Sequence, residues 1–278
     1  MKISKINLIK FIITLLLIYI KILYNNIKYI YKLERGSYRM DGLFIQIIFL
    51  IVSYLLGSIP WALIIGKIVK GIDIREHGSK NMGATNAFRV LGFKYGLLVF
   101  ALDALKGGII LFIMKHNFFN FDLGDFVIHP LAYGACAFLG HLFPIFAKFK
   151  GGKGMATASG IVLFYHPIAF AFGLLTFLIV IITTRFVSLS SCVTAIAVLI
   201  TSFFFKDNYY ITIGDITITY FSIILIFICT FLIVKHISNF KRILKHTETK
   251  INFKAINDPK EKAFLTEDEE KEIINKKK

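Results

Sequence analysis

The chain has 278 residues, of which 56% are hydrophobic, and its mean hydropathy is +0.69. Soluble domains contain about 45–50% apolar residues, so this composition indicates a membrane protein and argues against a soluble globular domain. The net charge of +16 would also suit a nucleic-acid-binding protein. Most Lys and Arg residues, however, lie between or beside apolar runs, which fits membrane topology and anionic ligands better, so we expect no nucleic-acid partner.

The N-terminal residues 1–39 fit this pattern poorly. They carry eight Lys or Arg residues against one Glu, and their best uncharged apolar run, FIITLLLIYI, has ten residues. A bilayer-spanning helix needs about 20 apolar residues, so the run is more typical of a signal-like or interfacial segment. A second interpretation is that translation begins at Met40 and that the leader is a misassigned start. In either case residues 1–39 form an extension outside the core.

Longer apolar stretches follow, and we expect them to be helices that span a bilayer. They run roughly over 43–66, 95–114, 127–147, 168–184, 187–205 and 217–235. A shorter apolar stretch, 155–165, ends at His166-Pro167, where the proline restricts the preceding residue and breaks the helix. The cysteines Cys136, Cys192 and Cys229 lie in apolar segments without metal-ligand spacing, so we interpret them as small core residues with no disulfide or metal role.

The distribution of basic residues predicts the topology. Lys and Arg gather in the loop after the first span, in the loop after the third span and beyond the last span. The loops 115–129 and 206–216 carry one Lys each, Lys115 and Lys206, among Asp residues. Because cytoplasmic loops of membrane proteins carry an excess of Lys and Arg, we assign the three basic regions to the cytoplasmic side.

Residues near 150 and near 240 are then both cytoplasmic, so the chain between them must cross the bilayer an even number of times. Three long apolar stretches lie between them, and the short stretch 155–165 must therefore be a fourth crossing. The sequence predicts an all-α integral membrane protein with seven transmembrane helices and three motif loops on the cytoplasmic face. The N-terminus of the core would lie outside and its C-terminus inside.

Three basic, polar loops lie on this predicted cytoplasmic face: GIDIREHGSKNMGATNAFRVLG, GHLFPIFAKFKGGKG and KHISNFKRILKHTETK. Glycines allow backbone N–H groups to approach an anion, while hydroxyl and amide side chains add donors and Lys and Arg add charge. Any one basic residue would serve equally to anchor a helix end. Anchoring does not explain the accompanying glycines, which are Gly78, Gly83, Gly151, Gly152 and Gly154. The loops therefore predict a polyanion site, above all for phosphate.

Motifs of several other enzyme classes are absent. FKGGKGMA is not a Walker A loop, because Gly154 follows Lys153 where Ser or Thr is required. TASG has Thr157 where a nucleophile elbow needs Gly. The HxxxxD signature of other glycerolipid acyltransferases is also missing, since His116 and Asp122 are one residue too far apart.

A transporter of phosphorylated metabolites is the alternative function. It would place ionisable residues deep in its spans and polar residues near both membrane faces. The main intramembrane pair, Asp103 and Lys106, lies three residues apart on one helix face, and a structural role and a substrate role remain open for it. A third interpretation, a non-catalytic lipid-anchored scaffold, leaves the glycine loops unexplained.

Taken together, the loops resemble the three signature motifs of the bacterial acyl-phosphate:glycerol-3-phosphate acyltransferases, the PlsY family. GSIP (57–60) with DIREHGSKNMGATNAFRVLG resembles the first motif, GHLFPIFAKFKGGKGMATASG (140–160) the second and HISNFKRILKHTETK (236–250) the third. DALKGG (103–108) and RFVSLSS (185–191) resemble further stretches of the family. The resemblance covers about residues 40–250, which we take as the acyltransferase domain, and leaves residues 251–278 as a charged cytoplasmic tail.

The resemblance implies a seven-helix membrane fold and transfer of a fatty acyl group from acyl phosphate to the 1-hydroxyl of glycerol 3-phosphate. The products would be lysophosphatidic acid and phosphate, and no coenzyme A, acyl carrier protein, metal or other cofactor would be needed. We expect the chain to work as a monomer in the bilayer of the bacterial inner or plasma membrane, with its active site on the cytoplasmic face.

The resemblance also implies roles for single residues. The catalytic set is Ser79, Arg89, Lys153, His236 and Asn239. The substrate-binding set is Gly78, Asn81, Gly83, Thr85, Asn86, Lys106, His141, Gly151, Gly152, Gly154, Arg185 and Arg242. The third motif is the least faithful, with Ile237-Ser238 where the family usually has Arg-Glu and His246 where it often has Gly, so an ion pair at these positions is in doubt. The proton acceptor is open between His236 and a phosphate oxygen of the substrate.

Overall fold

The computed structural model describes residues 42–120, 123, 127–205, 210–213, 216–253, 264–266 and 268–269. The predictions for residues 1–39 lie outside this part of the chain. The chain divides into two compact units, and the first contains 42–47, 123 and 127 of the described residues. Within it, the Gln46 side chain donates hydrogen bonds to the carbonyls of Gly42 and Leu123, both at 3.2 Å. All other described residues from Ile48 onward belong to the second unit.

Each apolar stretch that the sequence predicts as a span contains at least one helix. The longer helices are α2 (Gly42–Gly57), α3 (Trp61–Lys70), α5 (Phe93–Lys115), α6 (Pro130–Leu142), α7 (Met155–Tyr165), α8 (Pro167–Thr184), α9 (Val187–Ser202) and α10 (Tyr220–Leu244). Three short elements complete the helical part: η2 (Ile74–Glu76), α4 (Ala84–Leu91) and η3 (Ile145–Ala147). The prediction of a mostly helical protein is therefore confirmed over the described residues.

The structure supports fewer full spans than the sequence predicts. Within the described ranges, four helical segments are long and apolar enough to cross a bilayer, and a fifth results if α2 and α3 count as one bent span. The helices α7 and α9 are shorter apolar helices. At 1.5 Å per residue α7 is about 16 Å long, roughly half the thickness of a hydrocarbon core. Seven crossings therefore remain a prediction.

The first predicted span is not one continuous helix. Its two halves, α2 and α3, are bent by 40° at Ser58–Pro60. Pro60 has no N–H group to donate and disfavours helical geometry at the residue before it, which explains the break. The second half extends to Lys70, beyond the predicted end at residue 66, and stops at Gly71, which has a positive φ of 71°.

Two short hairpins interrupt the all-α pattern that we predict. The strands β1 (Tyr210–Ile213) and β2 (Ile216–Thr219) pair antiparallel between α9 and α10, where the alternating Ile and Thr residues favour a strand. Thr219 then caps α10 by accepting a hydrogen bond from the Ser222 amide at 3.1 Å. The strands β3 (Lys250–Ile251) and β4 (Phe264–Leu265) form a second antiparallel pair after α10.

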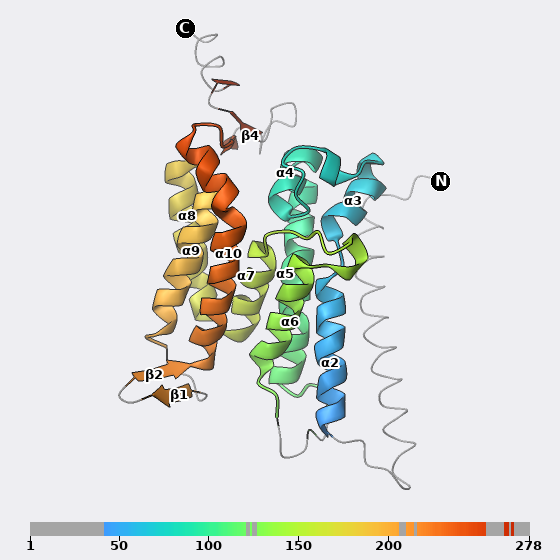
Figure 1. The fold of residues 1–278 in the computed structure, drawn as a ribbon, viewed down its shortest axis with the longest axis vertical. Coiled ribbons are helices and arrows are strands. Elements are labelled where there is room, and N and C mark those ends of the chain that lie inside the picture. The colour runs from blue at the N-terminus through green and yellow to red at the C-terminus, as the bar shows by residue number, and fades with distance from the viewer. Residues whose placement is uncertain are drawn as a thin grey trace. The chain divides into compact units, whose positions relative to one another are not determined.

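Close contacts between small residues hold the helices of the second unit together, as is common in membranes. A Cβ atom on Gly160 of α7 would lie 1.8 Å from the carbonyl oxygen of Ala104 in α5, and one on Gly107 would lie 2.3 Å from that of Thr157. The helices α5 and α7 therefore touch backbone to backbone. On the other side, α9 packs against both α8 and α10 (Figure 1).

The three motif segments contact one another in the second unit, through Arg89 with Thr249 and through Lys153 with Asn239. Figure 1 shows α4 and the strand β4 at the same end, whereas β1 and β2 lie at the opposite end of α9 and α10. An apolar core formed by residues of α5 to α10, including Leu111, Phe138, Ile161 and Phe221, fills the space below the motif segments. This arrangement brings segments that are 160 residues apart in sequence, Arg89 and Thr249, into contact.

Candidate active site

A cavity of about 880 Å³ lies in the second unit, within the size range of small-molecule sites. Its lining changes in character along α10, from the apolar Leu225 and Ile228 to the polar Asn239 and Arg242. The seventeen residue-to-residue steps from Leu225 to Arg242 span about 25 Å at 1.5 Å per step. The apolar part is completed by residues of α7, α8 and α9, including Val162, Phe170, Leu174 and Val198. The cavity thus has a charged end, which Arg89, Lys153 and Arg242 line, and a long apolar end.

The buried amide of Asn86 organises the first motif segment. Its Oδ1 atom accepts a hydrogen bond from the Ser79 backbone N–H at 2.8 Å, and its Nδ2 atom donates to the carbonyls of Ile74, His77 and Asn81. A Cβ atom on Gly78, which has a positive φ of 59°, would lie 2.4 Å from that Oδ1 atom. Ser79 is therefore held at the cavity by the conformation of Gly78 and by the side-chain amide of Asn86.

The rest of this segment also lines the cavity. Gly83 precedes the first residue of α4, and its N–H donates to Asn81 Oδ1 at 3.0 Å. Asn81, Gly83, Thr85 and Arg89 all line the cavity wall. The sequence interpretation of a loop that presents donors is therefore compatible with the geometry, although Thr85 and Arg89 lie on a helix, α4.

The glycines of the second motif have two different environments. Gly154 lines the cavity, has a positive φ of 91° and would place a Cβ atom 2.4 Å from the Phe138 ring. Gly151 and Gly152 lie outside the cavity lining, where a Cβ atom would meet the His141 carbonyl at 2.1 Å and the His141 ring at 2.2 Å. These two glycines allow the loop to pass close to α6, a packing reason that the sequence interpretation missed.

The third motif is mostly helical, which corrects the expectation of a loop. His236, Asn239 and Arg242 lie on the last turns of α10, and the loop begins only after Leu244. No Pro or Gly interrupts this stretch, so the helix continues out of its apolar part. The helix thereby presents these side chains to the cavity from one face, at spacings of three residues.

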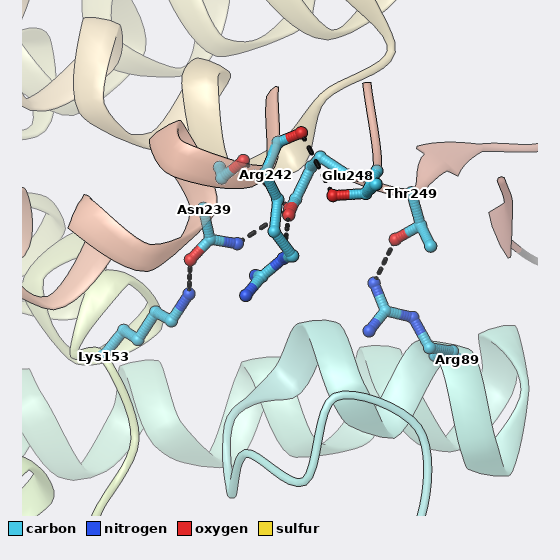
Figure 2. Close-up of polar contacts among 8 residues, drawn as sticks. Arg89, Lys153, Asn239, Arg242, Glu248 and Thr249 are labelled. Carbon is cyan, nitrogen blue, oxygen red and sulfur yellow. Dashed lines mark hydrogen bonds and ion pairs between the residues drawn. The ribbon is translucent and has the colours of Figure 1, made fainter. Parts of the chain in front are cut away.

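The carboxylate of Glu248 connects the second and third motif segments (Figure 2). It is 6% exposed, and its oxygens accept hydrogen bonds from Arg242 Nε at 2.7 Å, Asn239 Nδ2 at 2.7 Å and Ser188 Oγ at 3.2 Å. Asn239 Oδ1 in turn accepts from the Lys153 ammonium group. The sequence analysis assigned no role to Glu248 or Ser188. The sequence does single out Glu248, because it is the lone acidic residue in KHISNFKRILKHTETK.

Two cations at the charged end lack a carboxylate partner. Among the residues that the structure describes, Arg89 and Lys153 form no ion pair, and the buried Nε atom of Arg89 has no hydrogen-bond partner. Burial and the nearby Arg242 lower the pKa of Arg89, and burial above all lowers the pKa of Lys153 to about 8, against an opposing effect of Glu248. A bound anion would relieve this repulsion, so the geometry favours an anionic ligand.

His236 presents one defined tautomer to the site. It is 4% exposed, and its Nδ1 atom lies 2.7 Å from the carbonyl oxygen of Leu232. Because a carbonyl oxygen only accepts hydrogen bonds, Nδ1 carries the proton. In the neutral ring Nε2 is then an acceptor, and the residue lines the cavity between the charged and apolar ends.

A second buried polar group lies beside the charged end. The Lys106 ammonium group is 2.8 Å from Asp103 Oδ1 and donates to the Ile59 carbonyl at 2.8 Å, while His141 Nδ1 lies 3.7 Å from the same carboxylate oxygen. Asp103 and His141 line the cavity, whereas Lys106 does not. The contacts of Lys106 tie α5 to the break between α2 and α3, which favours the structural interpretation of the pair.

Arg185 also lies outside the cavity lining. It has a positive φ of 64°, and its Nε atom donates to the Ile251 carbonyl at 3.0 Å. Of the residues predicted from the sequence, Lys106, Gly151, Gly152 and Arg185 therefore lie outside the lining, and the other predicted site residues belong to it.

Comparisons with known proteins give the family. A model described as glycerol-3-phosphate acyltransferase matches residues 47–246. The glycerol-3-phosphate acyltransferase of Bacillus subtilis (strain 168) is 47% identical over 207 residues, which cover 73% of this chain and 96% of that protein. That of Bacillus cytotoxicus (strain DSM 22905 / CIP 110041 / 391-98 / NVH 391-98) is 46% identical over 211 residues, or 76% of this chain and 98% of that protein.

Two solved structures are also similar. The glycerol 3-phosphate form of PlsY (YgiH), an integral membrane glycerol 3-phosphate acyltransferase, has a TM-score of 0.65 and 35% identity, with coverage of 76% of this chain and 98% of that one. The lysophosphatidic acid form has a TM-score of 0.62 and 36% identity, with coverage of 74% and 95%. The chain, a multi-pass helical membrane protein, belongs to the glycerol-3-phosphate acyltransferase family.

Proposed function

We propose that this chain transfers a fatty acyl group from acyl phosphate to the 1-hydroxyl of sn-glycerol 3-phosphate. The products are lysophosphatidic acid and phosphate, and the reaction is the first acylation of bacterial phospholipid synthesis. The observation that carries the proposal is the charged end of the cavity, where Arg89, Lys153 and Arg242 converge beside a long apolar end. Family membership supports it, as do the glycerol 3-phosphate and lysophosphatidic acid forms of the solved relative.

The chemistry of both substrates matches the two ends of the cavity. Each substrate carries a phosphate group, and Lys and Arg are the side chains that bind phosphate through charge-assisted hydrogen bonds. The acyl chain needs an apolar surface, which the lining residues of α7 to α10 provide. An acyl phosphate dissolved in the bilayer would enter between these helices with its phosphate directed to the charged end.

The reaction needs no acyl-enzyme, because an acyl phosphate is a mixed anhydride that is already activated. The 1-hydroxyl oxygen attacks the acyl carbonyl carbon, an ester bond forms, and the bond between that carbon and the phosphate oxygen breaks. Arg89 and Lys153 stabilise the charge that develops on the leaving phosphate, and the site holds the two substrates in register. Ser79 and Asn239 contact the substrates from the first and third motif segments. The proposal gives no role to a coenzyme, a carrier protein or a metal.

The hydroxyl proton passes to His236 in this mechanism. The hydrogen bond between His236 Nδ1 and the Leu232 carbonyl leaves Nε2 as the acceptor in the neutral ring. A neutral imidazole is a suitable general base near neutral pH. The alternative acceptor is a phosphate oxygen of the substrate itself.

The proposed topology has seven crossings, with α2 and α3 as one bent span and α7 as a short crossing packed against α5. In this topology the charged end of the cavity lies on the cytoplasmic face of the bacterial inner or plasma membrane, which the Lys and Arg residues of the motif segments support. The N-terminus of residues 40–250 then lies outside, and one chain contains all the catalytic groups, which is consistent with a monomer.

Purified protein in detergent should release phosphate from palmitoyl phosphate only when glycerol 3-phosphate is present. We expect lysophosphatidic acid to form in equal amount, because the acyl group and the phosphate come from one donor molecule. Palmitoyl-coenzyme A, the matched control donor, should not be used. A folded sample that turns over neither donor would contradict the proposal and favour the transporter alternative, which liposome uptake of glycerol 3-phosphate would then test.

Lys153 should make the activity depend on pH. Its pKa is lowered to about 8, so the side chain is charged below that pH and loses its charge as the pH rises through it. Because kcat/KM reports ionisation of the free enzyme, we expect kcat/KM to fall above about pH 8.

The Lys153→Arg variant is the matched control, because the guanidinium group stays charged in this range. Its kcat/KM should be lower than that of the wild type near neutral pH but should lack the alkaline fall. An identical alkaline fall in both proteins, after subtraction of uncatalysed hydrolysis, would assign the ionisation to another group.

The His236→Gln variant tests the proton acceptor. Glutamine cannot take up the proton, so we expect kcat to fall about 10²- to 10⁴-fold while KM changes little. His246→Gln is the control, since His246 is exposed and does not line the cavity, and it should retain kcat within about twofold of the wild type. Near-normal turnover of His236→Gln at saturating substrate would leave the phosphate oxygen as the acceptor.

A further inference from the structure

Part of the cavity wall lies beyond the residues that the family model matches. The match ends at residue 246, whereas β3 (Lys250–Ile251) and β4 (Phe264–Leu265) form an antiparallel pair, the tail hairpin, after it. From these two strands, Ile251 and Phe264 line the cavity. The sequence analysis interpreted residues 251–278 as a solvated charged tail. Contrary to that interpretation, Phe264 and Leu265 are 7% and 6% exposed.

The tail hairpin is anchored to the body of the second unit. The Ile251 N–H donates to the Arg185 carbonyl at 2.9 Å, and Arg185 Nε donates back to the Ile251 carbonyl at 3.0 Å. Immediately after β4, the Thr266 N–H donates to the Glu269 carboxylate at 3.0 Å and the Glu269 N–H donates to Thr266 Oγ1 at 3.3 Å. This reciprocal pair is the pattern of a capping box, which fixes the direction of the chain as it leaves the strand.

Phe264 lies on the guanidinium group of Arg89. The central guanidinium carbon is 4.7 Å from the centre of the ring, within the range of a cation–π contact. The Arg89 Nη2 atom also donates to Thr249 Oγ1 at 2.5 Å, as Figure 2 shows. Both contacts come from the segment after α10, so this segment determines where the Arg89 side chain points.

An aromatic ring suits this place better than a carboxylate would. Arg89 is largely buried, and Arg242 nearby has the same charge, so the bare cation is disfavoured there. The negative face of an aromatic ring stabilises a cation without using any of its N–H donors. A carboxylate would neutralise Arg89 and occupy the donors that a phosphate needs. With Phe264 on its face and Thr249 on one donor, Arg89 keeps its remaining donors for an anion.

We propose that Phe264 is a positioning residue, which holds the Arg89 guanidinium group at the charged end of the cavity with its N–H donors directed to a phosphate. The tail hairpin thus contributes to the anion site by positioning Arg89. This inference rests on the proposed function for its physiological ligand. Its test uses inorganic phosphate as the probe, because equilibrium binding of phosphate is measurable whether or not acyl transfer occurs.

The decisive comparison is between Phe264→Leu and Phe264→Tyr in the full-length protein, with phosphate binding measured by calorimetry. Leucine keeps apolar bulk but has no π face, so we expect it to weaken phosphate binding about three- to thirtyfold, the effect of a lost cation–π contact. Tyrosine keeps the ring and should bind within about twofold of the wild type. In the acyl-transfer assay, Phe264→Leu should raise KM for a phosphorylated substrate more than it lowers kcat.

Leu265→Ala is the structural control, because Leu265 is as buried as Phe264 in the same strand but does not line the cavity. It should bind phosphate within about twofold of the wild type. A double-mutant cycle adds a second control: in an Arg89→Ala background, Phe264→Leu should have no further effect.

The outcomes separate the two proposals. Equal weakening by Phe264→Leu and Leu265→Ala, or wild-type binding by Phe264→Leu, would overturn the inference while leaving acyl transfer intact. Additive effects of Phe264→Leu and Arg89→Ala would overturn it as well. Phosphate binding that depends on Phe264, in a protein that transfers no acyl group, would support the inference and refute the proposed function.

Discussion

At the charged end of the cavity, one buried carboxylate holds side chains from several segments in place. Glu248 accepts hydrogen bonds from Arg242, Asn239 and Ser188, and Asn239 passes the connection on to Lys153. A single negative charge thus orients two cations, Arg242 directly and Lys153 through Asn239, and Arg89 lies beside them without a carboxylate partner among the described residues. The surplus positive charge is unfavourable in a buried place until an anion arrives. The arrangement of the site, and the phosphate binding that we propose for it, both depend on this imbalance.

The rest of the fold keeps this surplus positive charge next to the apolar end of the cavity. Contacts between glycines and neighbouring backbone bring α5 and α7 together, and α8, α9 and α10 enclose the apolar end. Charged groups are costly in the middle of a bilayer, so their position at the ends of helices and in the connecting loops is expected. An acyl phosphate has the same division into a charged head and an apolar chain. The cavity would therefore present each part of this proposed acyl donor with the surroundings it requires.

The helices were largely predictable from the sequence, because long apolar runs are local signals, and most residues that the motif resemblance selected line the cavity. The contacts that arrange the site were not predictable. Asn86 bonds to four backbone groups of a folded loop, which no spacing rule reveals. Gly151 and Gly152 looked like anion-binding glycines, yet their space is filled by His141. The helical end of α10 was missed because its charges suggested a loop, although nothing in the stretch breaks a helix. The position of Phe264 was not predictable from a charged tail, since its strand forms only by pairing with residues thirteen and fifteen positions earlier.

In the mechanism that we propose, Arg89 and Lys153, from two separate motif segments, receive the substrate phosphate at the charged end of the cavity. The most direct measurement is the diffraction structure of the full chain in complex with glycerol 3-phosphate. We expect phosphate oxygens within about 3 Å of the Arg89 guanidinium and Lys153 ammonium nitrogens, with Glu248 still bound to Arg242. Glycerol 3-phosphate bound elsewhere, with Arg89 and Lys153 making no contact to it, would contradict the proposed role of these two residues.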